Sequence, residues 1–292
     1  MTTIIIHLAL RILSWLPLEV ARWLGRRLGD GVWLLNLREK KSALTNIRLA
    51  FPRLSDKEQY ELAKSSVRSA GEWFCELGKV WAGSLDQLEA MAVTIQGLEL
   101  VEAAKAQSRG VIILAPHLGN WEFAGLYLNK TLPLACLYEP PNVAGLESLM
   151  VSRRTRTGMS LYPTTAKGIV GLTRVLKAGG GIGILPDQVP RDLSSGCNAE
   201  FMGHSCFTQT LGLKLAQRTG AAVLFLVAYR VPQGFSVHIT KAPELVSTGD
   251  TTDAATAMNK AIEELLRDYP EQYQWTYKRF RVRPQQGVNH YH

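Results

Sequence analysis

An aliphatic run followed by a helical pattern constrains the fold of this chain more than any other feature. Val111–Ala115 is a run of five aliphatic residues that stops at Pro116, which predicts a short buried strand. The residues from Asn120 to about Leu128 predict a helix with Asn120 as its N-cap. His117 is therefore expected at the C-terminal end of a strand, where open α/β sheets bind their ligands.

The sequence from about residue 93 onward continues this alternation. Further strands are predicted at 134–138, 182–185, 221–229 and 235–240, and further helices at 167–177, 209–218 and 253–268. Such alternation predicts an α/β fold with a mostly parallel central sheet flanked by helices. The glycine-rich stretch at 179–183 leads into a strand, so we interpret it as a helix C-cap and a tight turn, not as a nucleotide loop.

The first 92 residues predict helices instead. Helices are expected at 19–37 and 56–81, the second one opened by a capping pattern at Ser55 and Glu58. Aromatic and aliphatic residues at helical spacing on the second helix are expected to face the core: Trp73, Phe74, Leu77 and Trp81. We expect a helical part over 1–92 and an α/β part over 93–292, which together form one continuous structural unit.

The N-terminal segment from Ile4 to Leu18 is almost wholly apolar. As a helix it would be about 22 Å long, whereas the hydrocarbon core of a bilayer is about 30 Å thick. Arg11 lies near its middle and Pro17 ends or bends it. This pattern favours a helix that lies in one leaflet of a membrane over a complete span. No small-residue cleavage site follows the segment, so a removed signal peptide is not expected.

The net charge of +8 calls for an acidic partner. No nucleic-acid-binding motif accompanies the basic residues, so we expect an anionic membrane or a phosphorylated lipid and no nucleic acid. The basic residues form three clusters: Arg22, Arg26, Arg27, Arg38, Lys40 and Lys41; Arg153, Arg154 and Arg156; and Lys278, Arg279, Arg281 and Arg283. The third cluster could meet either an acidic protein or lipid headgroups.

The four cysteines show no paired spacing. Cys197, His204 and Cys206 match no zinc-binding pattern, so no metal site is expected. Dispersed thiols are typical of the reducing, cytosolic side of a membrane.

Glu122 follows His117 by five residues, at the mouth of the same turn. A carboxylate that fixes the tautomer of an imidazole makes it a general base for a hydroxyl group, as in a catalytic dyad. The alternative is a strand-end histidine beside an acid that the helix dipole favours in a first helical turn.

The segment His117–Glu122 resembles the H-x4-D/E motif of glycerolipid-type acyltransferases, and in its full form that of the bacterial lipid A late acyltransferases, which include lauroyl and myristoyl transferases. Six further segments resemble that family in the same order along the chain: Arg38 with Asn46, Ile47 and Ala50–Pro52; Tyr138–Asn142; Arg153–Gly158; Leu185–Gln188; Phe201–Gly203 with Thr208; and Gln272–Trp275 with Arg279 and Phe280.

This resemblance implies a glycerolipid acyltransferase-like αβ fold with an N-terminal membrane anchor, at the cytoplasmic face of the bacterial inner membrane. It implies transfer of a fatty acyl chain from acyl carrier protein to a hydroxyl of a lipid A precursor, with acyl-acyl carrier protein as co-substrate and no other cofactor. Three alternatives stay open: the same transfer to another glycolipid or aminoacyl lipid, a membrane thioesterase or lipid hydrolase, and a catalytically silent membrane-binding protein.

In this hypothesis His117 takes the proton of the acceptor hydroxyl, and Glu122 orients and stabilises the imidazole. Asp187 follows a predicted strand and is expected to face the same cleft as His117, and Asn120 is expected to shape the turn at His117. We count both among the predicted substrate-binding residues.

The second basic cluster supplies the predicted substrate-binding residues Arg153, Arg154 and Arg156, because guanidinium groups bind phosphate and carboxylate bidentately. The resemblance points to Arg154 or Arg156 as the critical arginine.

Overall fold

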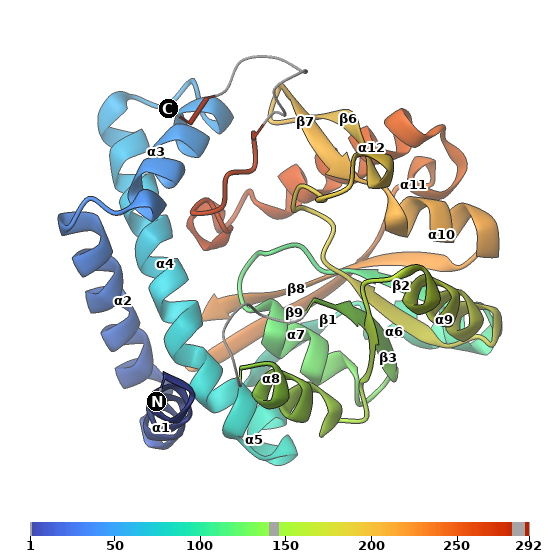
Figure 1. Cartoon of the computed structure of the whole chain (residues 1–292), viewed down its shortest axis with the longest axis horizontal. Helices are drawn as coiled ribbons and strands as arrows, with labels where there is room; N and C mark the ends of the chain where they lie inside the picture. Colours follow the sequence, from blue (N-terminus) through green and yellow to red (C-terminus); the bar gives the residue numbers. More distant parts are fainter. Residues whose placement is uncertain (1, 140–145, 282–289, 292) are drawn as a thin grey trace.

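The protein is an α/β structure in which helices cover both faces of a central sheet (Figure 1). The computed structural model describes residues 2–139, 146–281 and 290–291. Its sheet has seven strands in the order β1-β9-β8-β2-β5-β3-β4. Their bounds are β1 (Ala92–Gln96), β2 (Val111–Leu114), β3 (Leu134–Tyr138), β4 (Ser160–Pro163), β5 (Gly181–Ile184), β8 (Ala222–Val231) and β9 (Gly234–Lys241). Every neighbouring pair is parallel except β8 and β9, which confirms the predicted mostly parallel sheet.

The apolar run of β2 is continuous because both faces of the sheet are covered. Successive side chains of a strand point to opposite faces. Ile112 and Leu114 join the core cluster that contains α9 (Ala166–Lys177), α10 (Leu211–Thr219) and α12 (Thr251–Leu265). Val111 and Ile113 join the opposite cluster, which contains α6 (Leu98–Ala106), α7 (Trp121–Leu128) and α8 (Leu146–Thr155).

Five helices precede the sheet and stand along one side of it (Figure 1). They are α1 (Thr2–Trp15), α2 (Leu18–Leu34), α3 (Arg38–Ala50), α4 (Asp56–Ala82) and α5 (Leu85–Ala90). The predicted capping box at Ser55 and Glu58 is present and starts α4. The two longest of these helices approach very closely, because a Cβ on Gly71 would lie 2.1 Å from the carbonyl oxygen of Gly25. α4 therefore forms the support against which α2 packs.

The predicted helix over 19–37 is too long. α2 ends at Leu34, and Asn36 adopts a positive φ of 52° before α3 begins. Asn tolerates this left-handed conformation better than other residues with side chains, so the chain turns there. The expectation that Phe74 faces the core is also wrong, since the residue is 51% exposed, whereas Leu77 and Trp81 are buried.

α1 spans 14 residues and is followed by Pro17, which precedes α2. Within the described ranges, none of the helices combines the length and the apolar character needed to cross a bilayer.

Several elements after residue 91 were not predicted from periodicity: β1, α6, β4, α8, α11 (Leu245–Thr248), and a hairpin of β6 (Gly196–Phe201) and β7 (His204–Gln209). The hairpin turns at Met202 and Gly203, whose φ angles are both positive, as a tight two-residue hairpin turn requires. The glycine stretch at 179–183 is, as interpreted, the end of α9 followed by a turn into β5, with a φ of 80° at Gly179.

Candidate active site

The turn between β2 and α7 holds His117 and is fixed by backbone contacts with β8. The backbone N–H of Asn120 donates to the carbonyl of Ala228 at 2.8 Å. Gly119 adopts a φ of 63°, and a Cβ there would lie 2.1 Å from the same Ala228 oxygen. Only glycine satisfies both conditions, because it lacks the atom that would collide. The Asn120 side chain accepts the N–H of Phe123, so Asn120 is the N-cap of α7 as predicted.

The C-terminal segment of the described chain lies against the other side of this turn. The N–H of Gly119 donates to the carbonyl of Gln272 at 3.1 Å, and the N–H of Gln274 donates to the carbonyl of His117 at 2.9 Å. These bonds place the side chain of Gln274 beside the imidazole. Sequence order alone gives no sign of this contact.

Asp187 is the carboxylate that binds His117. β2 and β5 are parallel neighbours, so the residues that follow them meet at one edge of the sheet. The Oδ1 atom of Asp187 lies 2.7 Å from Nδ1 of His117, and Oδ2 accepts the backbone N–H of His117 at 2.8 Å. Burial raises the pKa of Asp187, but the charge and hydrogen bonds of His117 outweigh it and hold this pKa below the ordinary value. The structure thus brings Asp187 and His117 together as hydrogen-bond partners at this edge of the sheet, whereas a role of Asp187 in substrate binding stays a prediction.

Glu122 does not take the place expected for it beside Nδ1. Its carboxylate accepts Nε of Arg154 at 3.2 Å and Nε1 of Trp81 at 3.0 Å, and it forms a second, shorter bond to the Arg154 guanidinium. The physical reason is that the His117 ring turns toward the neighbouring strand β5, whereas Glu122 lies on the first turn of α7. Burial raises the pKa of Glu122, but Arg154 more than offsets this, and His117 lowers it further.

The three predicted substrate-binding arginines have different surroundings. Arg154 is held by Glu122. Arg156 donates to the carbonyls of Val80 and Gly83, and so joins the end of α8 to the end of α4. Arg153 is half-buried and has no hydrogen-bond or ion-pair partner among the residues that the structure describes. Their roles in substrate binding stay predictions.

Two tryptophans enclose the imidazole from the side. The ring of Trp121 meets that of His117 edge to face with centroids 4.8 Å apart, and Trp73 stacks on Trp121 at 4.4 Å. His117 is only 6% exposed as a result. Phe123 and Leu126, which follow on α7, are both buried in the core on that side of the sheet.

A buried ion cluster around Glu76 supports the turn, and sequence reasoning missed it. Glu76 is fully buried on α4 and accepts Nδ2 of Asn120 at 2.9 Å. It also accepts Nε of Arg22 at 2.6 Å and Nε of Arg230 at 2.8 Å. Two cations on one buried carboxylate compensate its desolvation. The only sequence signal was an acidic residue on the apolar face of a predicted helix.

The third basic cluster is not a single surface. Arg279 is 1% exposed and donates to Phe207, Thr208 and Asn259, so the expectation that it meets an external partner is wrong. Lys278 and Arg281 are exposed. Arg283 lies outside the described residues, as do residues 140–142 of the segment that begins at Tyr138.

Gln188 is a further site residue, which the sequence analysis included in the segment Leu185–Gln188 without giving it a role. Its amide nitrogen lies 3.1 Å from Nε2 of His117 and donates to Oε1 of Gln274 at 2.9 Å. Together with Asp187 and the backbone bonds, this contact occupies all four hydrogen-bonding positions of His117.

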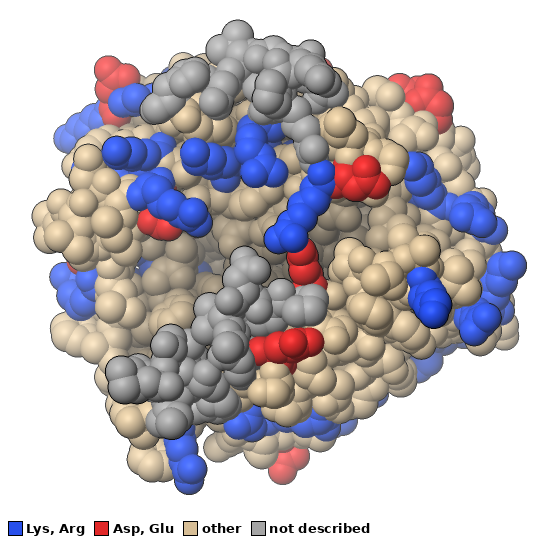
Figure 2. Space-filling view, in the orientation of Figure 1, with Lys and Arg blue, Asp and Glu red and all other residues tan. Residues whose placement is uncertain are grey.

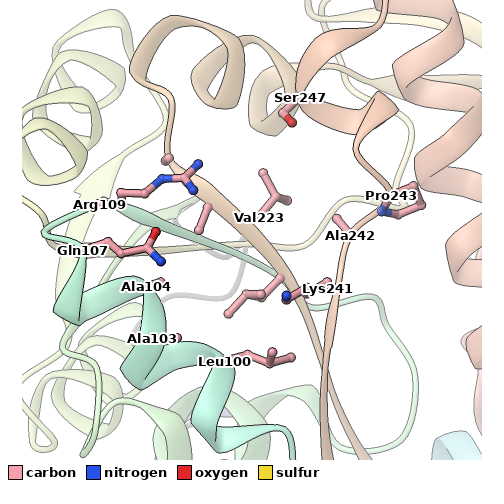
Figure 3. Close-up of a pocket in the computed structure, with 13 residues that line it drawn as sticks. Leu100, Ala103, Ala104, Gln107, Arg109, Val223, Lys241, Ala242, Pro243 and Ser247 are labelled. Atoms are coloured by element: carbon pink, nitrogen blue, oxygen red, sulfur yellow. The ribbon is translucent and has the colours of Figure 1, made fainter.

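The face of the molecule seen in Figure 1 is hollowed near its centre, and Lys and Arg side chains gather over α3 at its upper left (Figure 2). A separate cavity of about 290 Å³ lies at the other end of the strands, where Arg109, Val223 and Lys241 line it (Figure 3). Its strand residues are at the start of β8 and the end of β9, whereas His117 follows the end of β2. Among the described residues, no cluster of three or more His, Cys, Asp or Glu side chains could hold a metal ion.

Comparison with known proteins gives a consistent result along the chain. A family model described as bacterial lipid A biosynthesis acyltransferase matches residues 1–282. The chain is 29% identical over 272 residues to the lipid A biosynthesis palmitoleoyltransferase of Escherichia coli (strain K12), an alignment that covers 92% of this chain and 87% of the relative. It is 27% identical over 277 residues to the lipid A biosynthesis lauroyltransferase of the same strain, with 93% and 90% covered.

A more distant similarity involves a different acceptor. The phosphatidylinositol mannoside acyltransferase of Mycolicibacterium smegmatis (strain ATCC 700084 / mc(2)155) is 27% identical over 219 residues, which cover 72% of this chain and 69% of the relative.

Proposed function

Because this chain belongs to the bacterial lipid A biosynthesis acyltransferase family, we propose that it transfers a fatty acyl chain from an acyl carrier protein thioester to a hydroxyl of a lipid A precursor. The observation that carries the mechanism is the bond between Asp187 and Nδ1 of His117 at the carboxyl edge of the sheet. A carboxylate at Nδ1 is an acceptor, so the imidazole proton stays on Nδ1 and Nε2 keeps its lone pair. That lone pair is the base.

The reaction proceeds by direct attack. Nε2 of His117 takes the proton of the acceptor hydroxyl while the hydroxyl oxygen bonds to the thioester carbonyl carbon. The carbon–sulfur bond then breaks, and the imidazolium returns the proton to the leaving sulfur. Asp187 is hydrogen-bonded to the imidazole and Glu122 interacts with its charge, and the lowered pKa values of both carboxyls keep them negative at neutral pH. No acyl-enzyme is needed.

The arginines at the end of α8 are proposed to bind the acceptor. Arg153 is available to a phosphate or carboxylate, while Arg154 carries its charge beside Glu122 at the same end of the helix. A guanidinium binds phosphate oxygens bidentately, which fixes the position as well as the charge of the acceptor.

Membrane association is proposed through α1 and α2. Large apolar side chains are exposed along both helices and the turn after them: Leu8, Ile12, Trp15, Val20, Trp23, Leu28, Leu34 and Leu35. Exposed apolar area of this kind, with Arg11, Arg26 and Arg27 nearby, suits a helix pair lying in the headgroup region of an anionic bilayer. We place this association at the cytoplasmic leaflet of the bacterial inner membrane, as the resemblance to the family implies.

Lipid A mass spectrometry of cells that lack this protein, restored with wild type or with Glu122→Ala, tests the proposal. We expect deletion to remove one acyl chain and only wild type to restore it. If another glycolipid loses an acyl group instead, the proposed acyl transfer is right but the proposed acceptor is wrong. The similarity to the mannoside acyltransferase favours this alternative. If no lipid changes in a strain without other members of the family, the proposed transfer is wrong.

A further inference from the structure

The nitrogen that must accept a proton is already occupied in the structure. Nε2 of His117 lies 3.1 Å from the amide nitrogen of Gln188. Since Asp187 holds the imidazole proton on Nδ1, Nε2 has a lone pair and needs a donor opposite it. The side-chain oxygen of Gln188 could not fill that role. The amide must therefore point its NH2 group at the base.

A second glutamine fixes this orientation. The same amide nitrogen of Gln188 donates to Oε1 of Gln274 at 2.9 Å, so its two protons point at two different acceptors. Gln274 is itself placed by the bond from its backbone N–H to the carbonyl of His117. The backbone N–H of Val189, next to Gln188, donates to the hydroxyl of Tyr277 at 3.0 Å. Gln274 and Tyr277 thus hold the Gln188 amide beside Nε2 of His117.

An amide in this position discriminates between two nucleophiles. A water molecule that reached Nε2 of His117 would displace the hydrogen bond from Gln188 and would form only one hydrogen bond to Nε2 in its place. A lipid acceptor brings binding energy from its remote groups, and that energy can displace the amide. The difference matters because the acyl donor is a thioester, which water can also attack.

We propose that Gln188 covers the proton-accepting nitrogen of His117 until the acceptor lipid displaces it, so that this side chain sets the ratio of acyl transfer to donor hydrolysis. The inference rests on the proposed function. In the unwanted reaction, water would lose a proton to Nε2 and bond to the thioester carbonyl carbon. The carbon–sulfur bond would break, and the proton would return to sulfur, which leaves a free fatty acid and a thiol.

The test is Gln188→Met, which keeps the length of the side chain and removes the donor. The purified enzyme in detergent is given acyl-acyl carrier protein with and without the lipid A precursor. We expect hydrolysis without acceptor to rise about tenfold relative to transfer, the value of one ordinary hydrogen bond. Gln217→Met is the matched control, because Gln217 is exposed on α10 and, within the described part of the chain, bonds only to the carbonyl of Gly249.

A chemical probe reads the same contact without catalysis. Diethyl pyrocarbonate acylates a free imidazole nitrogen, and peptide mass spectrometry follows the modification of each histidine. We expect Gln188→Met to speed modification of His117 and to leave His204, which bonds to Leu49, unchanged. Gln274→Met removes only the second acceptor of the Gln188 amide. It should raise both the ratio of hydrolysis to transfer and the rate of His117 modification, but by less than Gln188→Met. This variant replaces Gln188→Met if that protein does not fold.

An unchanged ratio of hydrolysis to transfer in folded Gln188→Met would overturn the inference, as would an unchanged rate of His117 modification. If wild type moves no acyl group to any lipid, the proposed function itself is wrong and the inference falls with it. The transfer assay on wild type shows that outcome independently of the variants.

Discussion

Asp187 binds His117 twice, through the backbone N–H and through Nδ1 of the same residue. The first bond fixes where the residue lies, and the second fixes how its ring is turned and which nitrogen carries the proton. Because β2 and β5 are paired in register, both contacts follow from the sheet itself. The carboxylate that binds the proposed base thus follows a neighbouring strand and lies seventy residues from His117 in the sequence.

Asp187→Asn should abolish most activity without unfolding the protein. An amide can donate to Nδ1, which would leave the proton on Nε2 and remove the base; a comparable change in a serine protease costs about 10⁴-fold in turnover. Turnover of acyl-acyl carrier protein by the purified variant measures the effect. A variant within a few-fold of wild type would exclude Asp187 as the residue that directs His117.

Glu122→Gln should cost stability as well as activity. It leaves the Arg154 guanidinium without its carboxylate, and removing one partner of a buried ion pair costs about 3–5 kcal/mol. The double variant Glu122→Gln with Arg154→Met should recover most of the free energy of unfolding but not the activity. Urea denaturation and a transfer assay separate the two effects. Recovery of activity in the double variant would show that Glu122 serves only to neutralise Arg154.

Acid should destabilise the protein through the same carboxyls. The pKa values of Asp187 and Glu122 are below their ordinary values of 3.8 and 4.5. Their stabilisation is therefore complete above those ordinary values and is lost as the pH falls through the lower, folded-state values. Unfolding free energies measured between pH 7 and pH 3 should decrease most steeply below about pH 4.5, and less steeply for Asp187→Asn. Parallel curves for wild type and variant would contradict this assignment.

Two glycines, one in the turn at His117 and one inside α7, should respond oppositely to alanine. Gly119→Ala places a Cβ 2.1 Å from the Ala228 oxygen at a positive φ, so we expect a loss of at least about 1–3 kcal/mol and of most activity. Gly125→Ala, inside α7, meets only the end of Met159 at 3.7 Å and should gain about 0.5–1 kcal/mol. Thermal unfolding of the two variants side by side makes the comparison.

The α/β class and the strand that precedes His117 were predictable because β2 and β8 are largely buried and have continuous apolar runs. The hairpin of β6 and β7 was not, since its turn depends on positive φ at Met202 and Gly203, which a periodicity argument does not detect. α8 was not predicted either, because the arginines of its last turn were interpreted as a basic cluster and not as the end of a helix.

The site was predictable to the extent that parallel strands end at a common edge. That rule placed Asp187 with His117. It could not show that Asp187 and not Glu122 binds Nδ1, because ring orientation is decided by the tertiary contacts of the turn. The positions of Gln188 and Gln274 depend on a segment that returns to the turn from the far end of the described chain.

That return has a consequence for how the protein comes into being. The turn at His117 is completed by Glu76 through Asn120 from the first third of the chain, by Asp187 from the middle, and by Gln272 and Gln274 near the end. The ribosome synthesises these segments one after another, so the site around His117 cannot form before the last of them has been synthesised. We therefore expect a nascent or truncated chain to be inert toward an acyl donor, so that only the completed chain would act on activated fatty acid.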